Sequence, residues 1–198
     1  LGVCWRLAVD LAARGEAVRL WVDDARALAW MAPDGAPRVE LRPWPQRPLE
    51  DEPADVVIEA FGCDLPEDFV ARMAARRVPP VWINLEYLSA EDYVARSHGL
   101  PSPQRNGLVK WFFYPGFDEG SGGLLREPSL LEQRRAFDAQ AWLASQGLAR
   151  RPGERVVSLF CYDNAALAGL LERLAEEPTL LLVTAGLAAR QVRQALGP

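Results

Sequence analysis

The sequence is poor in the residues that most often carry nucleophilic or metal chemistry. It has one histidine and three cysteines among 198 residues. A lone histidine, His98, offers little from which to build a Ser-His-Asp mechanism, so we expect a structural hydrogen-bonding role for it. Cys4, Cys63 and Cys161 lie far apart and lack the spacing of metal ligands, so we expect buried free thiols and no metal site.

Long apolar runs and a surplus of positive charge are missing as well. No run approaches the roughly 18 apolar residues that a membrane span needs. The net charge of -5 and the pI near 5.1 disfavour nonspecific binding to nucleic acid, which requires a basic face. With 49% hydrophobic and 25% charged residues, the composition is that of an ordinary globular protein. We therefore expect a cytoplasmic protein that binds neither nucleic acid nor membrane.

Apolar periodicity alternates between strand and helix types along the chain. One helical stripe begins at Val3 and ends near Gly15, and a short helix capped by Asp23 and Asp24 ends at Met31. This order predicts an α/β fold, with a largely parallel sheet and helices on both faces. The other expected elements are strands at 17–22, 38–42, 54–61, 80–84, 109–114, 155–161 and 179–183, and helices at 66–77, 90–97, 128–146, 165–176 and 187–196.

The alternation also suggests how the chain is divided. We expect a Rossmann-like domain over residues 1–127 and a connecting helix and linker over 128–153, which includes a Gly-bounded break. A fresh strand-helix run over 154–198 then predicts the beginning of a second Rossmann-like domain. That run ends before it could close a sheet, so we expect the second domain to be incomplete.

Polar and aromatic residues at strand ends are the first candidates for a binding site. Asn84, Glu86 and Tyr87 come at the end of a buried strand pattern, and in open α/β sheets ligands bind outside the carboxyl ends of the strands. Glu86 could pair with a cationic acceptor and Tyr87 could pack against it. An equally good interpretation is a loop that only holds the edge of the sheet.

Two further candidates suit a nucleotide and its phosphates. Phe160 and Tyr162 end a strand pattern on one face and could stack on a base, although two core aromatics would give the same pattern. Gly2, at a helix N-terminus, could let the backbone approach a diphosphate, or could be a packing glycine. Asp163 and Asn164 fit a cap of the following helix better than a binding role.

The order and spacing of several segments resemble the bacterial elongation factor P arginine rhamnosyltransferases, the EarP family. The resemblance extends from Gly2 to about Leu182. It rests on the segments Val81–Asp92, His98–Ser102, Trp111–Phe117, Gly122–Glu127 and Ser158–Asn164, and on Gly2–Ala8 at the start.

This resemblance implies a GT-B fold, with two Rossmann-like domains, and an enzyme that transfers L-rhamnose from dTDP-β-L-rhamnose to an arginine of elongation factor P. It implies inversion at the anomeric carbon, with no metal and no cofactor. The first domain would contact the acceptor protein through Asn84, Glu86 and Tyr87. The second would hold the nucleotide through Phe160 and Tyr162, with Gly2 at the diphosphate.

The family also has an aspartate-containing loop before the segment that matches Gly2–Ala8 and an Arg-Gly-Glu-Asp-Ser motif further on, and neither occurs in this sequence. An arginine nitrogen is a weak nucleophile, so carboxylates are needed to orient the guanidinium and offset its charge. We therefore expect a fragment that contains no catalytic residue and is inactive alone. Two alternatives stay open: a different GT-B enzyme with a small acceptor, and a noncatalytic α/β binding module.

Overall fold

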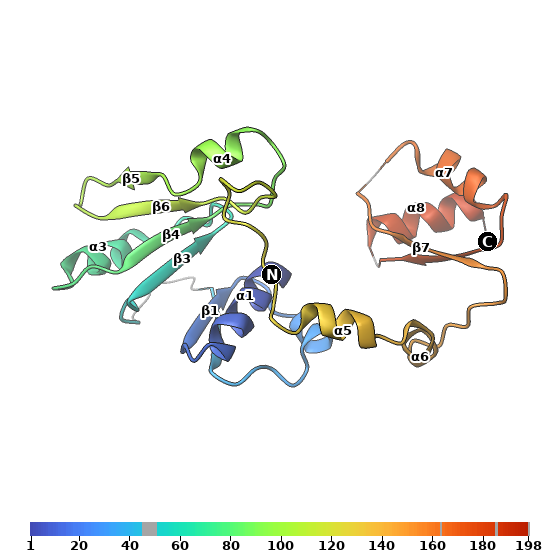
Figure 1. Cartoon of the computed structure of the whole chain (residues 1–198), viewed down its shortest axis with the longest axis horizontal. Coiled ribbons are helices and arrows are strands. Elements are labelled where there is room, and N and C mark those ends of the chain that lie inside the picture. The colour runs from blue at the N-terminus through green and yellow to red at the C-terminus, as the bar shows by residue number, and fades with distance from the viewer. Residues whose placement is uncertain (45–50, 163, 185, 198) are drawn as a thin grey trace. The chain divides into compact units, whose positions relative to one another are not determined.

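The computed structural model describes residues 1–44, 51–162, 164–184 and 186–197 (Figure 1). The chain divides into two compact units, Leu1–Leu130 and Leu131–Pro198. Both contain parallel strands connected through helices, which confirms an α/β fold. None of the helices in the described ranges combines the length and apolar character that crossing a bilayer requires.

The first unit begins with a helix and a two-stranded parallel sheet. Helix α1 (Gly2–Ala13) is followed by β1 (Val18–Val22), α2 (Leu28–Met31) and β2 (Val39–Pro43), and β1 pairs with β2 from Val18↔Val39 onward. Gly15 ends α1 as expected, because it takes a left-handed conformation at φ +103° that other residues adopt only with strain. Ala8 and Ala12 are the buried apolar residues of α1.

The larger sheet of this unit has the strand order β3-β4-β6-β5. Strands β3 (Val56–Ala60), β4 (Val81–Leu85) and β6 (Val109–Phe113) are parallel, and β5 (Pro101–Pro103) is antiparallel to β6. The sequence did not predict β5. A segment of three residues with two prolines has little strand character, and it forms here as an edge strand, where proline is tolerated.

Helix α3 (Glu67–Ala75) covers the larger sheet with its apolar face. Phe69 and Met73 are almost fully buried against Val57, Trp82 and Leu108. Burial of a side chain of this size contributes about 1.5–3 kcal/mol. In addition, Trp21 of β1 packs against this cluster, with its ring edge-on to Phe69 at 6.3 Å.

An ion pair with a buried carboxylate links two of the three parallel strands of the same sheet. Glu59 is 2% exposed, and one of its oxygens lies 3.0 Å from Nζ of Lys110, the one lysine of the sequence. The same carboxylate accepts a hydrogen bond from Nε1 of Trp82 at 3.1 Å, and the Lys110 ammonium lies 4.4 Å from the centre of a Trp82 ring. The buried carboxylate therefore has both a cation and a hydrogen-bond donor as partners, and the cation is itself half-buried.

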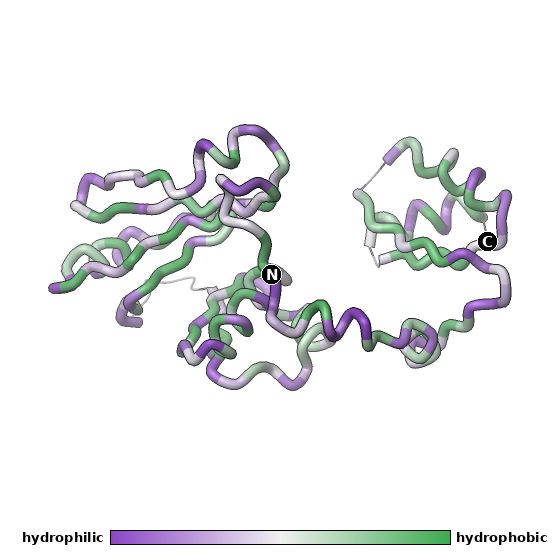
Figure 2. The backbone as a smooth tube through the Cα atoms, in the orientation of Figure 1, coloured by the Kyte–Doolittle hydropathy of each residue, from purple (hydrophilic) through white to green (hydrophobic). Residues whose placement is uncertain are grey.

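The second unit is smaller. Parallel strands β7 (Arg155–Leu159) and β8 (Thr179–Val183) pack against α7 (Leu167–Leu174) and α8 (Leu187–Leu196). Leu167, Leu171 and Val192 form its core. Figure 2 shows apolar residues concentrated along the strands in both units.

Two expectations about this fold need correction. The predicted helix 128–146 is two helices, α5 (Leu130–Ala136) and α6 (Ala139–Ser145), because Asp138 caps α6 by accepting the N–H groups of Gln140 and Ala141. The described strands of the first unit form two sheets, because β1 and β3 are not hydrogen-bonded neighbours, and their pairings are parallel as expected except for that of β5 with β6. The fourth helix of the first unit, α4, spans Tyr93–Ser97, three residues shorter at its start than expected.

Candidate functional site

The carboxyl ends of β3, β4 and β6 lie at one edge of the larger sheet, because the three strands are parallel. Backbone hydrogen bonds continue past the strand ends and hold the following residues together. The Phe61 N–H donates to the Leu85 carbonyl at 2.8 Å, and the Glu86 N–H donates to the Phe113 carbonyl at 2.9 Å. Side chains that follow three different strands are thereby fixed as neighbours.

Asn84 and Glu86 form the polar centre of this edge. Their i, i+2 spacing places both on one face of the extended backbone. Asn84 is 3% exposed and Glu86 is half-buried. The Asn84 amide donates from Nδ2 to Oε1 of Glu86 at 2.6 Å, so the buried amide is satisfied and the carboxylate is held.

Tyr87, the residue after Glu86, contributes an exposed aromatic ring. Its side chain is 65% exposed and stacks on Phe61, with ring centres 4.4 Å apart and planes inclined by 19°. Phe61 has φ +59°, a left-handed conformation that costs a bulky residue about 1–3 kcal/mol. The two rings come from the ends of adjacent strands, so the stack ties two loops together.

Tyr114 is a site residue that the sequence analysis missed. It follows β6 directly, and its ring stacks on Phe112 at 6.1 Å and meets Tyr93 edge-on at 5.8 Å. Partial burial raises the pKa of Tyr114, and the nearby Glu86 carboxylate raises it further. Tyr114 was expected within a core strand, but its position just after β6, like that of Glu86 just after β4, could have identified it.

The backbone around Tyr114 is held by a structural histidine. Nδ1 of His98 accepts the Tyr114 N–H at 3.1 Å, and its ring lies edge-on to Phe113 at 4.9 Å, which confirms the structural role expected for His98. Gly122 packs against the same ring of Phe113, where an added Cβ would come within 2.5 Å of ring atoms. Only glycine fits this close approach without movement of the Phe113 ring.

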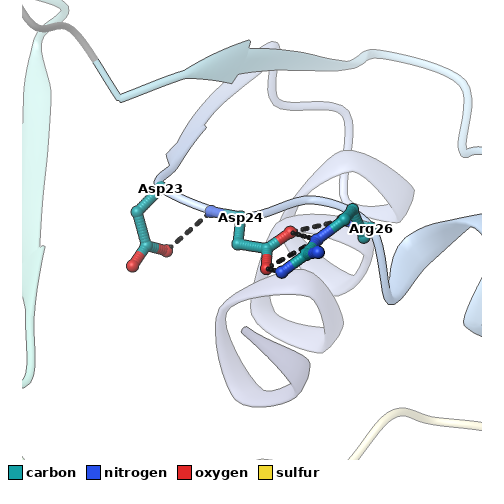
Figure 3. A network of polar contacts seen from close by, with 3 residues as sticks. All are labelled: Asp23, Asp24 and Arg26. Atoms are coloured by element: carbon teal, nitrogen blue, oxygen red, sulfur yellow. Dashed lines mark hydrogen bonds and ion pairs between the residues drawn. The ribbon is translucent and has the colours of Figure 1, made fainter.

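The predicted cap by Asp23 and Asp24 is wrong in detail. The Asp24 carboxylate accepts the backbone N–H and the guanidinium of Arg26, while Asp23 accepts the N–H of Asp24 (Figure 3). These contacts shape the turn before α2, whose first turn has no side-chain cap. The hydrogen bonds from Arg26 lower the pKa of the Asp24 carboxyl to about 2.

Gly2 is the first residue of α1. A Cβ at this position would lie 3.6 Å from the methyl group of Met31, an ordinary contact, so packing within the described chain does not require glycine here. One turn on, Arg6 forms two hydrogen bonds of 2.7 Å with the Glu127 carboxylate and lowers its pKa to about 2. This ion pair ties the start of α1 to the segment that precedes α5.

The cysteines are free but not buried as expected. Cys63 is exposed, and Cys4 and Cys161 are half-buried. Cys63 follows β3 in a turn. Partial burial raises the pKa of both Cys4 and Cys63, so these two thiols stay protonated near neutral pH and are weak nucleophiles.

In the second unit, Phe160 and Tyr162 follow β7 directly. They are 75% and 79% exposed, with ring centres 6.2 Å apart, so they are not core residues. Asn164 accepts the N–H of Ala166 two residues on and so shapes the turn before α7 without capping the helix itself. Asp163 lies outside the described residues.

The family and the relatives that the chain matches are all named as rhamnosyltransferases. The sequence model of the family described as "Elongation-Factor P (EF-P) rhamnosyltransferase EarP" matches residues 1–198. The chain is 51% identical to a protein-arginine rhamnosyltransferase of Pseudomonas aeruginosa over 94% of its own length and 54% of that protein. It is 48% identical to the protein of the same name from Pseudomonas putida, over 100% of the chain and 56% of that protein. A further relative of that name, from Neisseria meningitidis, is 40% identical over 92% of the chain and 50% of that protein. The chain therefore spans about half the length of the curated relatives it matches.

Proposed function

The chain belongs to the EarP family of elongation factor P rhamnosyltransferases, and on that premise we propose that the full-length protein transfers L-rhamnose to an arginine of elongation factor P. The donor is dTDP-β-L-rhamnose, and transfer proceeds with inversion, without a metal or a cofactor. The observation that carries this proposal is the family match over residues 1–198, with relatives up to 51% identical that are named for this activity. The protein is proposed to act in the cytoplasm.

The fold proposed for the full-length protein is GT-B, with a first domain at 1–127, a connecting segment at 128–153 and a second domain of which 154–198 is the beginning. In the doubly wound strand order 3-2-1-4-5-6, strand 1 is the central strand and lies between strand 2 and strand 4. Strands β1 and β2 suit strands 2 and 3 of this order. Strands β3, β4 and β6 suit strands 4, 5 and 6, on the other side of strand 1. The two sheets are then parts of one layer around a central position that no described strand fills. The packing of Trp21 against the core of the larger sheet supports this arrangement.

The acceptor side of the proposed reaction is the edge formed by Asn84, Glu86 and Tyr87. The Glu86 carboxylate offers the charge and the acceptor oxygens that a guanidinium requires. The rings of Tyr87 and Tyr114 beside it offer aromatic surface, on which a planar guanidinium stacks well. This site would position the arginine without itself carrying out the transfer.

The residues proposed to bind the donor base lie in the second unit. Phe160 and Tyr162 are exposed at the carboxyl end of a parallel strand, where base-stacking residues of α/β proteins are expected. Their exposure supports a binding role, because two aromatics with no core function leave a large apolar surface in water. Packing does not explain why residue 2 is a glycine, because a Cβ at this position would make only an ordinary contact. Gly2 is therefore proposed to let the backbone approach the diphosphate.

The proposal is tested with the full-length enzyme, purified elongation factor P and dTDP-β-L-rhamnose. Mass spectrometry of the acceptor should show the addition of one deoxyhexosyl group at an arginine. An acceptor in which that arginine is replaced by lysine serves as the control and should stay unmodified. Absence of transfer to elongation factor P, with turnover of the same donor on a small acceptor, would contradict the proposal in favour of a different GT-B enzyme.

A further inference from the structure

Asn84 and Glu59 are both buried polar residues of the larger sheet, but they differ in their hydrogen-bond and ion-pair partners. Glu59, its register partner on β3, is buried with the cation of Lys110 beside it. Asn84 is equally buried, but its amide donates a hydrogen bond to the half-buried carboxylate of Glu86 at the edge of the sheet. A buried side chain of the core thus contacts a charged group at the surface.

The Asn84–Glu86 contact is of a kind that fixes a carboxylate without neutralising it. An amide N–H only donates, and a distance of 2.6 Å is short for an N–H···O bond, as expected when the acceptor is charged. Other carboxylates of the unit are paired with guanidinium groups, for example Glu127 with Arg6 and Asp24 with Arg26. Within the described residues no ion pair of this type involves Glu86, so its charge remains to attract a cation.

Asn84 is itself held on both sides. Its register partners are Glu59 on β3 and Phe112 on β6, and the ring of Phe112 stacks on Tyr114. An amide enclosed in this way has few alternative rotamers. A group bound to it is therefore held more rigidly than a carboxylate exposed to water would be.

We propose that Asn84 is a positioning residue for the acceptor arginine: it holds Glu86 in one orientation, with Oε1 occupied, so that the carboxylate meets an incoming guanidinium already in place. This inference rests on the proposed function and adds to it a division of roles. Glu86 contacts the substrate, and Asn84 acts through Glu86. The benefit is preorganisation, because the enzyme does not have to order the carboxylate when the acceptor binds.

A double-mutant cycle in the full-length enzyme tests this role. Asn84→Ala is expected to raise KM for elongation factor P about tenfold, as for a lost hydrogen bond to a charged group, while the affinity for dTDP stays unchanged. In a Glu86→Gln background, which itself weakens acceptor binding, Asn84→Ala should have little further effect. Asn106→Ala is the matched control, because Asn106 also makes a side-chain hydrogen bond, to the Leu108 N–H, but at the opposite end of β6.

Additive effects of the two substitutions, or an unchanged KM for the acceptor in Asn84→Ala, would overturn the proposal. If Asn84→Ala does not fold, Asn84→Ser and Asn84→Asp carry the test, because serine keeps a donor and aspartate removes it and adds a like charge. Acceptor binding should be weakened more by aspartate than by serine, and equal effects would again overturn the role. Failure of the wild-type enzyme to modify elongation factor P would instead contradict the proposed function, so the two failures are distinguishable.

Discussion

At the scale of single residues, backbone conformation and side-chain contact oppose one another at Phe61. Its left-handed backbone is one that glycine adopts freely, yet the ring makes a close stack with Tyr87. A bulky residue in such a conformation is retained where the surrounding structure compensates for it, and such residues cluster at functional sites. The stack on an exposed ring of the proposed acceptor site gives this strain a local reason.

A pair of substitutions at Phe61 separates the two effects. Both Phe61→Ala and Phe61→Gly remove the stack, but only glycine also relieves the strained φ. Phe61→Gly is therefore expected to be more stable than Phe61→Ala by about 1 kcal/mol, measured as the free energy of unfolding in urea. At Phe160, where φ is not positive, the alanine variant should instead be more stable than the glycine variant. If alanine is the more stable variant at both positions, the Phe61 backbone is not strained.

At the scale of secondary-structure elements, the larger sheet is held by more than apolar packing. Its three parallel strands each contribute one member of the buried group Glu59, Trp82 and Lys110. A buried pair contributes little compared with apolar residues of the same volume, but removal of one partner leaves an uncompensated charge. The group therefore fixes which strands are neighbours more than it stabilises the sheet.

This view predicts strong non-additivity between Lys110 and Glu59. Lys110→Met should destabilise the protein by about 3 kcal/mol or more, because Glu59 is then buried without a cation. The double variant Lys110→Met with Glu59→Gln should recover most of this loss, since the glutamine carbonyl still accepts the Trp82 N–H. Urea unfolding of the two single variants and the double variant measures the coupling, and additive free energies would contradict the interpretation.

At the scale of the whole molecule, the side chains proposed to bind the two substrates belong to different units. The acceptor candidates lie in Leu1–Leu130, and the exposed pair Phe160 and Tyr162 lies in Leu131–Pro198. Each unit has a hydrophobic core of its own. Substitutions of Glu86 and of Phe160 are therefore each expected to alter the binding of one substrate only.

The full-length enzyme offers a direct test of this division. Phe160→Ala should weaken dTDP binding by about 1–3 kcal/mol, the range for a lost stacking aromatic, and leave the affinity for elongation factor P unchanged. Glu86→Gln should weaken the binding of elongation factor P and leave the affinity for dTDP unchanged. Phe137→Ala, which removes another exposed ring of the second unit, is the control and should alter neither affinity in isothermal titration. Unchanged dTDP affinity in Phe160→Ala would exclude Phe160 as a base-stacking residue.

The sequence by itself determined the α/β class, most helices and strands, and the family. These follow from local information: apolar periodicity marks each element, and Asn84, Glu86 and Tyr87 stand at a strand end that periodicity alone locates. The bounds of β8 and α8 agree with the prediction, because their apolar patterns are uninterrupted.

Only the tertiary structure decided which residues meet. The stack of Phe61 on Tyr87, the place of Tyr114 beside Glu86 and the pair of Glu59 with Lys110 join residues from different strands. Strand order and register bring them together, and neither can be read from the spacing within one segment. The exposure of Phe160 and Tyr162 was also undecided, since alternation gives the face of a strand but not whether another element covers it.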